Sequence, residues 1–538
     1  MRRGTGALVA LIGLAGVAIH LYAQSGPPST PTQVTQTSYL KASNPDAADH
    51  FGCGGVLQGH TGQGVAISAD GMTLAIGAPH EASASPGING NQKDNSVFDA
   101  GAVYVFTRKG EHWIQQAYVK ASNPRSSAEF GHAVSLSADG NTMAVSAFWE
   151  SSNAKGINGN QKDESIPQAG AVYTFTRRGT TWTQQAYIKA SNTGEAGTAD
   201  VFGDGDQFGF SIALNADGNT LAVGALTEDS AATGINGNQA DNSKASAGAV
   251  YVFTRSGTTW SQQAYVKPSD IDAGDLFGYS VALTADGNTL AVGAFDEDGS
   301  ARTINGPIDN KANGSGAAYV FTRTGSDWSQ QAYIKPSNGE AQDSFGVEVA
   351  LSDDGSTLLV GSLDEDCSAT GVNPPGCDND QKEDVSAGAA YVFVRSGTTW
   401  SQQAFLKASN TGFNDWFGSR LALSGDGNVA AIGASLEDSN ATGINGNQKD
   451  DSANEAGAAY LFVRTGTTWQ QQAYIKGSNT EAYDEFGSSL ALDRSGRTLV
   501  ISARGEDGGG RGEGGKQSDN SVDEAGAVYV FHVTRKSG

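Results

Sequence analysis

A glutamate recurs in seven places along the chain, each time just after a short apolar segment, and these carboxylates are the residues best suited to chemistry. They are Glu81, Glu150, Glu228, Glu297, Glu365, Glu437 and Glu506. An aspartate follows directly in five copies, at Asp229, Asp298, Asp366, Asp438 and Asp507. A GINGNQ-type sequence comes next, as at residues 234–239, and then a further acidic or amide residue. Carboxylate, amide and backbone oxygens gathered in one loop suit a hard cation such as Ca²⁺.

The calcium interpretation names a specific set of ligands and competes with two others. The predicted ligands are Glu228, Asp229, Asn236, Asp241, Glu297, Asp298, Glu437 and Asp438. In the second interpretation, the Asn and Asp side chains only bond to the backbone of their own loops. In the third, the glutamates pair with lysines that also recur seven times, at Lys41, Lys120, Lys189, Lys267, Lys335, Lys407 and Lys476. Only the first requires a cofactor, Ca²⁺.

Catalytic groups would be expected to break a sevenfold pattern, and the histidines do so. His50, His60, His80 and His132 all fall in the first copy or at the start of the second, and Trp149 is close to them in sequence. These five residues are the candidate ligand-binding residues, although exposed histidines without a function are common. No GxSxG or HExxH motif and no glycine-rich phosphate loop stands in a suitable context, so no catalytic residue is assigned.

Short β-strands must position these residues. In the fourth copy, FGYSVALT from Phe277 and NTLAVGA from Asn288 alternate side chains between two faces, as strands do. The Asp286-Gly287 pair between them predicts a tight hairpin. GAAYVF from Gly316 and QQAYIK from Gln330 are the third and fourth strands. Each copy is therefore a four-stranded antiparallel meander with one long loop, between its second and third strands.

The copies repeat in phase with a period of about 70 residues. Both faces of each sheet carry apolar residues, which indicates sheets packed between sheets. We therefore predict an all-β fold, a seven-bladed β-propeller. The last copy lacks a fourth strand, and a matching segment, QTSYLKASN, stands at the start from Gln36. The N-terminal strand is thus expected to close the ring.

Two copies deviate from the pattern. In the first, Phe51-Gly52 comes early, and Thr61-Gly62 stands at the usual spacing before the strand. In the third, an insertion contains a spare pair, Phe202-Gly203. Insertions in repeat proteins map to loops.

The repeated motifs resemble those of the FG-GAP repeat family. Phe-Gly pairs are followed by VGA or a variant and then by GAVYVF or a variant; they begin at Phe130, Phe208, Phe277, Phe345, Phe417 and Phe486. This propeller family includes the head of integrin α subunits and exported bacterial proteins, and the resemblance implies extracellular binding and adhesion. Integrin-like calcium sites need a DxDxDG loop, whereas residues 137–142 read SADGNT, so those sites are not carried over.

The start of the chain predicts export. Arg2 and Arg3 precede an apolar run and the small residue Ala23, the layout of a secretory signal peptide. The predicted divisions are a signal peptide at 1–23, a linker rich in Pro, Ser and Thr at 24–35, and the propeller at 36–538. An uncleaved membrane anchor is the alternative. Otherwise no membrane insertion of the mature chain is expected.

Charge and cysteine content narrow the class of partner. The formal charge is −24, and loss of Arg2 and Arg3 makes it −26, which disfavours nucleic acid and anionic lipid. Cys367 and Cys377 lie in one loop and are predicted to form a disulfide, whereas the role of Cys53 is open.

Three functions remain open from the sequence. The first is a non-enzymatic, exported binding or adhesion protein that recognises a protein or glycan through its long acidic loops. The second is an enzyme, a hydrolase or lyase, with an off-symmetry site in the first two blades. The third is a structural surface protein.

Overall fold

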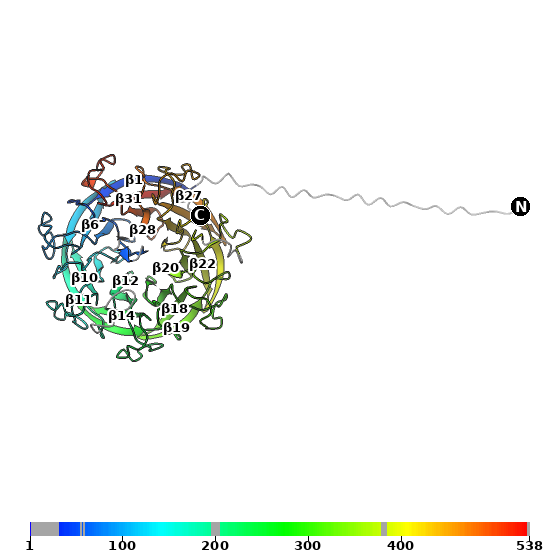
Figure 1. Ribbon diagram of the computed structural model, residues 1–538, viewed down its shortest axis with the longest axis horizontal. Helices are drawn as coiled ribbons and strands as arrows, with labels where there is room; N and C mark the ends of the chain where they lie inside the picture. The colour runs from blue at the N-terminus through cyan, green and yellow to red at the C-terminus, as the bar shows by residue number, and fades with distance from the viewer. Residues whose placement is uncertain (2–31, 54–55, 58–59, 195–204, 378–384, 535–538) are drawn as a thin grey trace.

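The computed structural model describes residues 1, 32–53, 56–57, 60–194, 205–377 and 385–534. The predicted signal peptide, most of the predicted linker and the spare pair Phe202-Gly203 lie outside these ranges. Seven sheets are arranged radially around one axis, with outer strands such as β1, β11 and β19 at the rim (Figure 1). All the principal elements of the described chain are strands, and the described residues contain no helix long and apolar enough to span a membrane. The predicted β-propeller is therefore confirmed.

The first three blades follow the predicted meander. Blade 1 comprises β4 (Val65–Ile67), β5 (Thr73–Ala78), β6 (Ala102–Lys109) and β7 (His112–Val119). Blade 2 comprises β8 (Val134–Leu136), β9 (Thr142–Ala147), β10 (Ala171–Arg178) and β11 (Thr181–Ile188). Blade 3 comprises β12 (Phe208–Leu214), β13 (Thr220–Ala225), β14 (Ala249–Ser256) and β15 (Thr259–Val266).

The next three blades repeat the same order from the axis to the rim. Blade 4 comprises β16 (Ser280–Leu283), β17 (Thr289–Ala294), β18 (Ala317–Thr324) and β19 (Asp327–Ile334). Blade 5 comprises β20 (Phe345–Leu351), β21 (Thr357–Ser362), β22 (Ala389–Ser396) and β23 (Thr399–Leu406). Blade 6 comprises β24 (Arg420–Leu423), β25 (Val429–Ala434), β26 (Ala458–Thr465) and β27 (Thr468–Ile475).

Blade 7 is built from both ends of the chain. It comprises β28 (Phe486–Leu492), β29 (Thr498–Ala503), β31 (Ala527–Thr534) and, as its outer strand, β1 (Gln33–Lys41). β1 is antiparallel to β31, with Gln33 opposite Thr534 and Leu40 opposite Val528. The short β30 (Gly512–Glu513) pairs with the end of β1. The predicted ring closure is therefore confirmed, although the strand begins at Gln33, inside the segment predicted as linker.

The Phe-Gly pair joins each blade to the one before it. The Phe130 ring packs edge-on against Tyr173 and Phe175 of its own blade, with centroids 5.4 and 6.1 Å away. Its backbone presses on Gly101 of the preceding blade, where a Cβ would lie 2.1 Å from the Phe130 carbonyl oxygen. Gly101 has a φ of +76°, so both its conformation and its surroundings require glycine.

In the first blade Phe51-Gly52 fills this role. The Phe51 ring contacts Tyr104 and Phe106, and the Gly52 N–H donates to the Gly77 carbonyl. The suggestion from spacing that Thr61-Gly62 takes the place of the pair is therefore wrong. The extra residues follow the pair instead and form a hairpin, β2 (Val56–Leu57) and β3 (His60–Thr61), near the centre of the ring in Figure 1.

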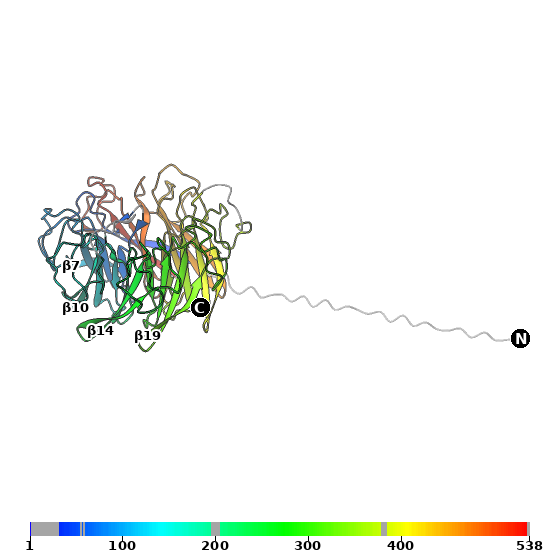
Figure 2. The ribbon, with the colours of Figure 1, turned by 60° about the horizontal axis from the view of Figure 1, so that its bottom comes forward.

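The two faces of the ring differ. One face, here called the long-loop face, carries the connections between strands two and three and those between blades. The opposite face, here called the hairpin face, carries the tight turns (Figure 2). Near the hairpin face, Arg177 stacks on Trp182 of blade 2, and both donate to the Gln116 side chain of blade 1. We call this three-residue contact a clasp.

Clasps join five of the seven blade interfaces. The others are Arg255–Trp260–Gln185, Arg323–Trp328–Gln263, Arg395–Trp400–Gln331 and Arg464–Trp469–Gln403. Blade 7 has Val533 opposite Val34 where the other blades have arginine opposite tryptophan. In the outer strand of blade 7, Thr37 occupies the position of the clasp glutamine, Gln116 in blade 1. Both interfaces of blade 7 therefore lack the clasp.

Candidate functional site

Each repeated glutamate is buried, and its hydrogen-bond partners come from its own blade and from the connection that precedes it. In blade 3 the Glu228 carboxylate accepts from the Lys267 ammonium at 2.9 Å and from the Tyr265 hydroxyl at 2.8 Å. It also accepts from the Asn192 amide, which belongs to the connection from blade 2, and from the Ser230 N–H. Because a buried charge is tolerated only when paired and hydrogen-bonded, this set of donors explains how Glu228 stays inside the sheet.

The same ion pair occurs in all seven blades. The pairs are Glu81–Lys120, Glu150–Lys189, Glu228–Lys267, Glu297–Lys335, Glu365–Lys407, Glu437–Lys476 and Glu506–Lys41, with N–O distances of 2.6 to 3.0 Å. Burial lowers the pKa of each lysine, and the partner glutamate opposes that shift. The structure thus places the glutamates as the lysine interpretation describes.

The remaining predicted calcium ligands accept hydrogen bonds from the backbone. Asp229, Asp298 and Asp438 accept from the N–H groups of Ser246, Gly314 and Glu455. Asn236 accepts from the Tyr265 N–H and Asp241 from the Ser243 N–H. Among the described residues, no group of three or more His, Cys, Asp or Glu side chains is arranged to hold a metal ion. Calcium binding at these loops stays a prediction.

A second set of buried carboxyls was not found from the sequence. In six blades an aspartate stands two residues before the phenylalanine of the Phe-Gly pair, and the side chain is buried: Asp49, Asp206, Asp275, Asp343, Asp415 and Asp484. Asp275 accepts from the Asp272 N–H, and burial raises the pKa of Asp275 to about 8, with Glu297 adding to the shift. The DxFG spacing is visible in the sequence and is the signal that could have revealed them.

Two positions per blade lie at the long-loop ends of the two strands nearest the axis, and their residues differ from blade to blade. One directly precedes the Phe-Gly pair: His50, Glu129, Gln207, Leu276, Ser344, Trp416 and Glu485. The other directly precedes the repeated glutamate: His80, Trp149, Thr227, Asp296, Asp364, Leu436 and Gly505. We call these fourteen positions the axis mouth. Neighbouring members contact each other, as the Ser344 hydroxyl does when it donates to Asp364 at 2.8 Å.

One part of the axis mouth, in blades 7, 1 and 2, is polar. The His50 and His80 rings lie 4.6 Å apart. His50 Nε2 is 2.9 Å from a Glu524 carboxylate oxygen, and His80 Nε2 is 3.9 Å from Glu129. Burial lowers the pKa of His80 to about 4 and raises that of Glu129 to about 8. At neutral pH the imidazole of His80 is therefore uncharged.

Aromatic side chains fill the opposite part. Phe148, Phe210, Tyr279 and Val347, from blades 2 to 5, belong to one apolar cluster, against which Trp149 and two other half-buried aromatic residues pack. His132 lies within this cluster, 3.9 Å from the Phe148 ring centroid, and burial lowers its pKa to about 3. Side chains from four blades can meet only near the axis, so the cluster lies there.

The predicted ligand-binding residues thus form two groups. His50 and His80 lie together in the polar part, whereas His132 and Trp149 both stack on Phe148. His60 lies in β3, but its side chain is outside the described part of the structure. Cys53 is buried near Arg504, and burial raises the pKa of its thiol to about 12, so the thiolate needed for nucleophilic chemistry is scarce.

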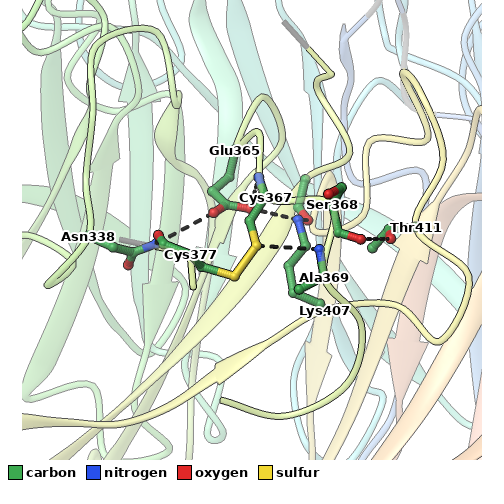
Figure 3. Close-up of a disulfide and its surroundings, with 9 residues drawn as sticks. Asn338, Glu365, Cys367, Ser368, Ala369, Cys377, Lys407 and Thr411 are labelled. Atoms are coloured by element: carbon green, nitrogen blue, oxygen red, sulfur yellow. Dashed lines mark hydrogen bonds and ion pairs between the residues drawn. A yellow bond between two sulfur atoms is a disulfide. The ribbon is translucent and has the colours of Figure 1, made fainter. Parts of the chain in front are cut away.

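Cys367 and Cys377 form a disulfide in the long loop of blade 5 (Figure 3). The Cys367 N–H donates to Glu365, as the Ser230 N–H does to Glu228. In blade 3 the Ser230 hydroxyl also donates to the Asn238 carbonyl across the loop. Blade 5 therefore has a covalent link where blade 3 has a hydrogen bond.

Two solved structures show weak likenesses to the chain. Hydrazine synthase from Kuenenia stuttgartiensis is similar at a TM-score of 0.43 and 11% identity, over 83% of this chain and 96% of that one. A "putative 6-phosphogluconolactonase" from Bacteroides uniformis is similar at a TM-score of 0.40 and 10% identity, over 77% and 85% of the two chains. Neither likeness bears on function. No curated protein sequence matches the chain.

Comparison with protein families is more informative. The FG-GAP repeat matches residues 113–175, 260–321, 328–393, 400–462 and 469–531, which together make up more than half of the chain. Each match runs from the tryptophan of one outer strand to the third strand of the next blade, so it spans a blade interface. The chain therefore belongs to the FG-GAP repeat family.

Proposed function

We propose that this protein is an exported, non-enzymatic binding protein that recognises a protein or glycan at the axis mouth of its long-loop face. One observation carries the proposal. The side chains that repeat in every blade are bonded inside the scaffold, whereas the side chains that differ between blades gather at the axis mouth. A scaffold that repeats sevenfold around one ring of variable, partly exposed positions suits recognition of a single ligand.

Half-buried aromatic residues make this ring suitable for binding. Trp149, Phe295 and Trp416 each expose part of a ring beside the apolar cluster. Asp296, which directly follows Phe295 in the chain, and Asp364 add two partly buried carboxylates to the axis mouth. Aromatic faces with a few fixed polar groups are the usual composition of ligand sites.

The polar part of the mouth supports a second candidate, an enzyme. His80, with its lowered pKa, and Glu129, with its raised pKa, are a neutral base and a carboxylic acid within 3.9 Å of each other. Groups whose pKa values are pushed in opposite directions are the usual partners in acid–base catalysis. The third candidate is a purely structural surface protein, in which neither His80 nor Glu129 has a functional role.

Binding of the mature chain to arrays of glycans and of extracellular proteins tests these candidates. We expect a ligand whose affinity falls at least tenfold in Trp149→Ala and is unchanged in Met72→Ala, an exposed residue on the hairpin face. Turnover of the captured ligand that is lost in both His80→Ala and Glu129→Gln would establish the enzyme instead. Absence of any ligand would favour the structural role.

A further inference from the structure

The long-loop face carries one ridge at each junction between blades. At each described ridge, a residue of the connection donates its N–H to a carbonyl in the long loop of the preceding blade. These bonds are Ala48 to Asp523, Ser127 to Phe98, Gly274 to Ala245, Gln342 to Asn313, Asn414 to Val385 and Tyr483 to Asn454, at 2.8 to 3.0 Å. Because the same bond recurs, residues at the ridges occupy equivalent places around the ring.

Large apolar side chains are exposed on one side of this ring of ridges. Phe413 is 68% exposed at the ridge between blades 5 and 6, Tyr483 is 58% exposed between blades 6 and 7, and Phe98 is 69% exposed between blades 1 and 2. Ala47 and Ala48 are exposed at the ridge between them, where blade 7 meets blade 1. We call these four consecutive ridges the aromatic arc. The two ridges between blades 3 and 5 present smaller or polar residues at the matching places: Ala245, Ala273 and Gly274 at one, Asn313, Ala341 and Gln342 at the other.

A single exposed apolar residue is ordinary, but three of them on four consecutive ridges would give several apolar contacts to one partner lying across those ridges. All three rings are more than half exposed, so they contribute little to the core. Exposed aromatic residues are also the side chains that most often dominate the energy of protein interfaces.

The charges beside the arc are acidic. Glu455, Glu481, Asp523 and Glu524 are exposed on its two central ridges. Glu524 contacts His50, and Glu481 accepts from the Asn520 amide. Arg125, on the ridge between blades 1 and 2, pairs with Glu164. Four other basic residues are exposed elsewhere in the described long loops of blades 1, 6 and 7: Lys93, Lys449, Arg511 and Lys516. Carboxylates beside aromatic faces attract lysine and arginine, by ion pairing and by cation–π contact, and the charge of −24 adds long-range attraction.

We infer that the aromatic arc is a docking surface for a basic polypeptide that also carries apolar side chains. The inference rests on the proposed function, because it names the class of partner for a protein that binds through its long-loop face. The partner would lie across several ridges, with its cations between the rings and the exposed carboxylates. Its footprint is therefore outside the axis mouth and can be tested separately.

A labelled peptide of alternating arginine and leucine is the probe, and its counterpart with glutamate for arginine is the first control. Binding to the mature chain is followed by fluorescence anisotropy at low and high NaCl. We expect binding of the arginine peptide only, with affinity that falls as salt rises. Combined replacement of Phe98, Phe413 and Tyr483 by serine should weaken it at least tenfold. Ile308→Ser, at a 45% exposed residue in the long loop of blade 4, should leave it unchanged.

Glu455→Gln combined with Asp523→Asn should slow association and reduce the salt dependence. Unaltered melting of the serine variant would show that the fold is intact. The inference is overturned if the arginine peptide does not bind at low salt, if the triple variant binds as tightly as the wild type, or if Ile308→Ser weakens binding equally. It is also overturned if maltohexaose binds and loses affinity in the triple variant, because the surface would then recognise glycans.

The two proposals fail separately. If the arrays give no ligand but peptide binding depends on the arc, the axis-mouth proposal fails and the arc stands. If Trp149→Ala abolishes binding of an array ligand and the peptide does not bind, the axis-mouth proposal stands and the inference about the aromatic arc fails.

Discussion

Each buried lysine in this protein forms an ion pair with one glutamate, and removing one member of such a pair should lower the free energy of unfolding. Lys267 is fully buried and donates to Glu228 and to the Gly248 carbonyl. Lys267→Met would leave the Glu228 carboxylate inside the sheet without a cation, and removing one partner of a buried pair typically costs about 3–5 kcal/mol. We expect a clear loss of free energy of unfolding in urea.

The matched control for this change is Lys449→Met, because Lys449 is exposed and should alter stability by less than about 0.5 kcal/mol. The double variant Lys267→Met, Glu228→Gln removes both charges and should recover part of the loss. Equal stability of Lys267→Met and Lys449→Met would contradict the role given to the ion pair.

The buried aspartates predict a dependence of stability on pH. Asp275 has a pKa of about 8 in the folded protein, far above its ordinary value of 3.8. The folded state therefore binds this proton more tightly than the unfolded state, so its contribution is full below pH 3.8 and is lost as pH rises through about 8. Asp49, Asp343, Asp415 and Asp484 act in the same direction.

Asp275→Asn isolates this effect, because the asparagine oxygen can still accept from the Asp272 N–H but does not titrate. One pKa unit corresponds to about 1.4 kcal/mol, so the variant should gain on the order of 1 kcal/mol or more relative to wild type between pH 6 and pH 9. Melting temperatures across this range provide the measurement. Parallel curves for variant and wild type would show that Asp275 does not titrate there.

At the residue scale, the sequence identifies side chains that could bond to one another, but it does not show which of the possible bonds form. The recurrence of Glu228 and Lys267 in every copy allowed their pairing, but it also allowed calcium at the same carboxylate. The Asn192 amide was missed because it comes from the preceding blade, and only packing shows that the two meet. His132 was grouped with His50 by sequence position, whereas strand alternation and the Phe148 ring place it in the aromatic cluster.

At the scale of elements, the strands and their order could be predicted almost completely, because alternation and turn residues recur in seven copies. The first blade shows the limit. Spacing suggested Thr61-Gly62, but Phe51-Gly52 holds the structural position because the Phe51 ring must reach Tyr104. Spacing alone cannot show where an insertion enters a blade.

Removing β1 should destabilise the ring. A chain that starts at Ala42 lacks Tyr39 and Lys41, both of which donate to the buried Glu506, and exposes the whole edge of β31. We expect a lower melting temperature and aggregation, because unpaired strand edges associate. A chain that starts at Thr32 retains β1 and is the control. Light scattering that shows a monomer of unchanged melting temperature for the shorter chain would contradict this role of β1.

The disulfide should have a local effect only. Replacing Cys367 and Cys377 by serine restores at position 367 the residue type found at Ser230 in blade 3, whose hydroxyl bonds across the loop. We expect a loss of no more than about 2–3 kcal/mol, because the loop that the bridge closes is short. Hydrogen exchange should increase in the loop of blade 5 and not in β20 to β23. Faster exchange throughout blade 5 would indicate a larger role.

At the scale of the whole molecule, the acidic charge allows a test of calcium binding. If the long loops bind Ca²⁺, the melting temperature should rise with Ca²⁺ and fall again with EDTA. The weak sites expected from few charges per loop require millimolar concentrations. NaCl at matched ionic strength is the control, because simple screening of the charge acts through ionic strength. Identical curves in CaCl₂ and NaCl would refute the calcium prediction.

The shared origin of blade 7 sets an order of events during synthesis. Gln33 emerges from the ribosome about 500 residues before its partner Thr534. Six blades can therefore assemble while β1 waits without a neighbour, and the final contact has the largest loop-closure cost in the molecule. The two interfaces of blade 7 also lack the clasp. Within blade 7, β1 is held by its pairing with β31 and by the buried ion pair Lys41–Glu506. Until β31 is complete, the edge of β1 has no partner, and unpaired edges of partly folded chains promote aggregation.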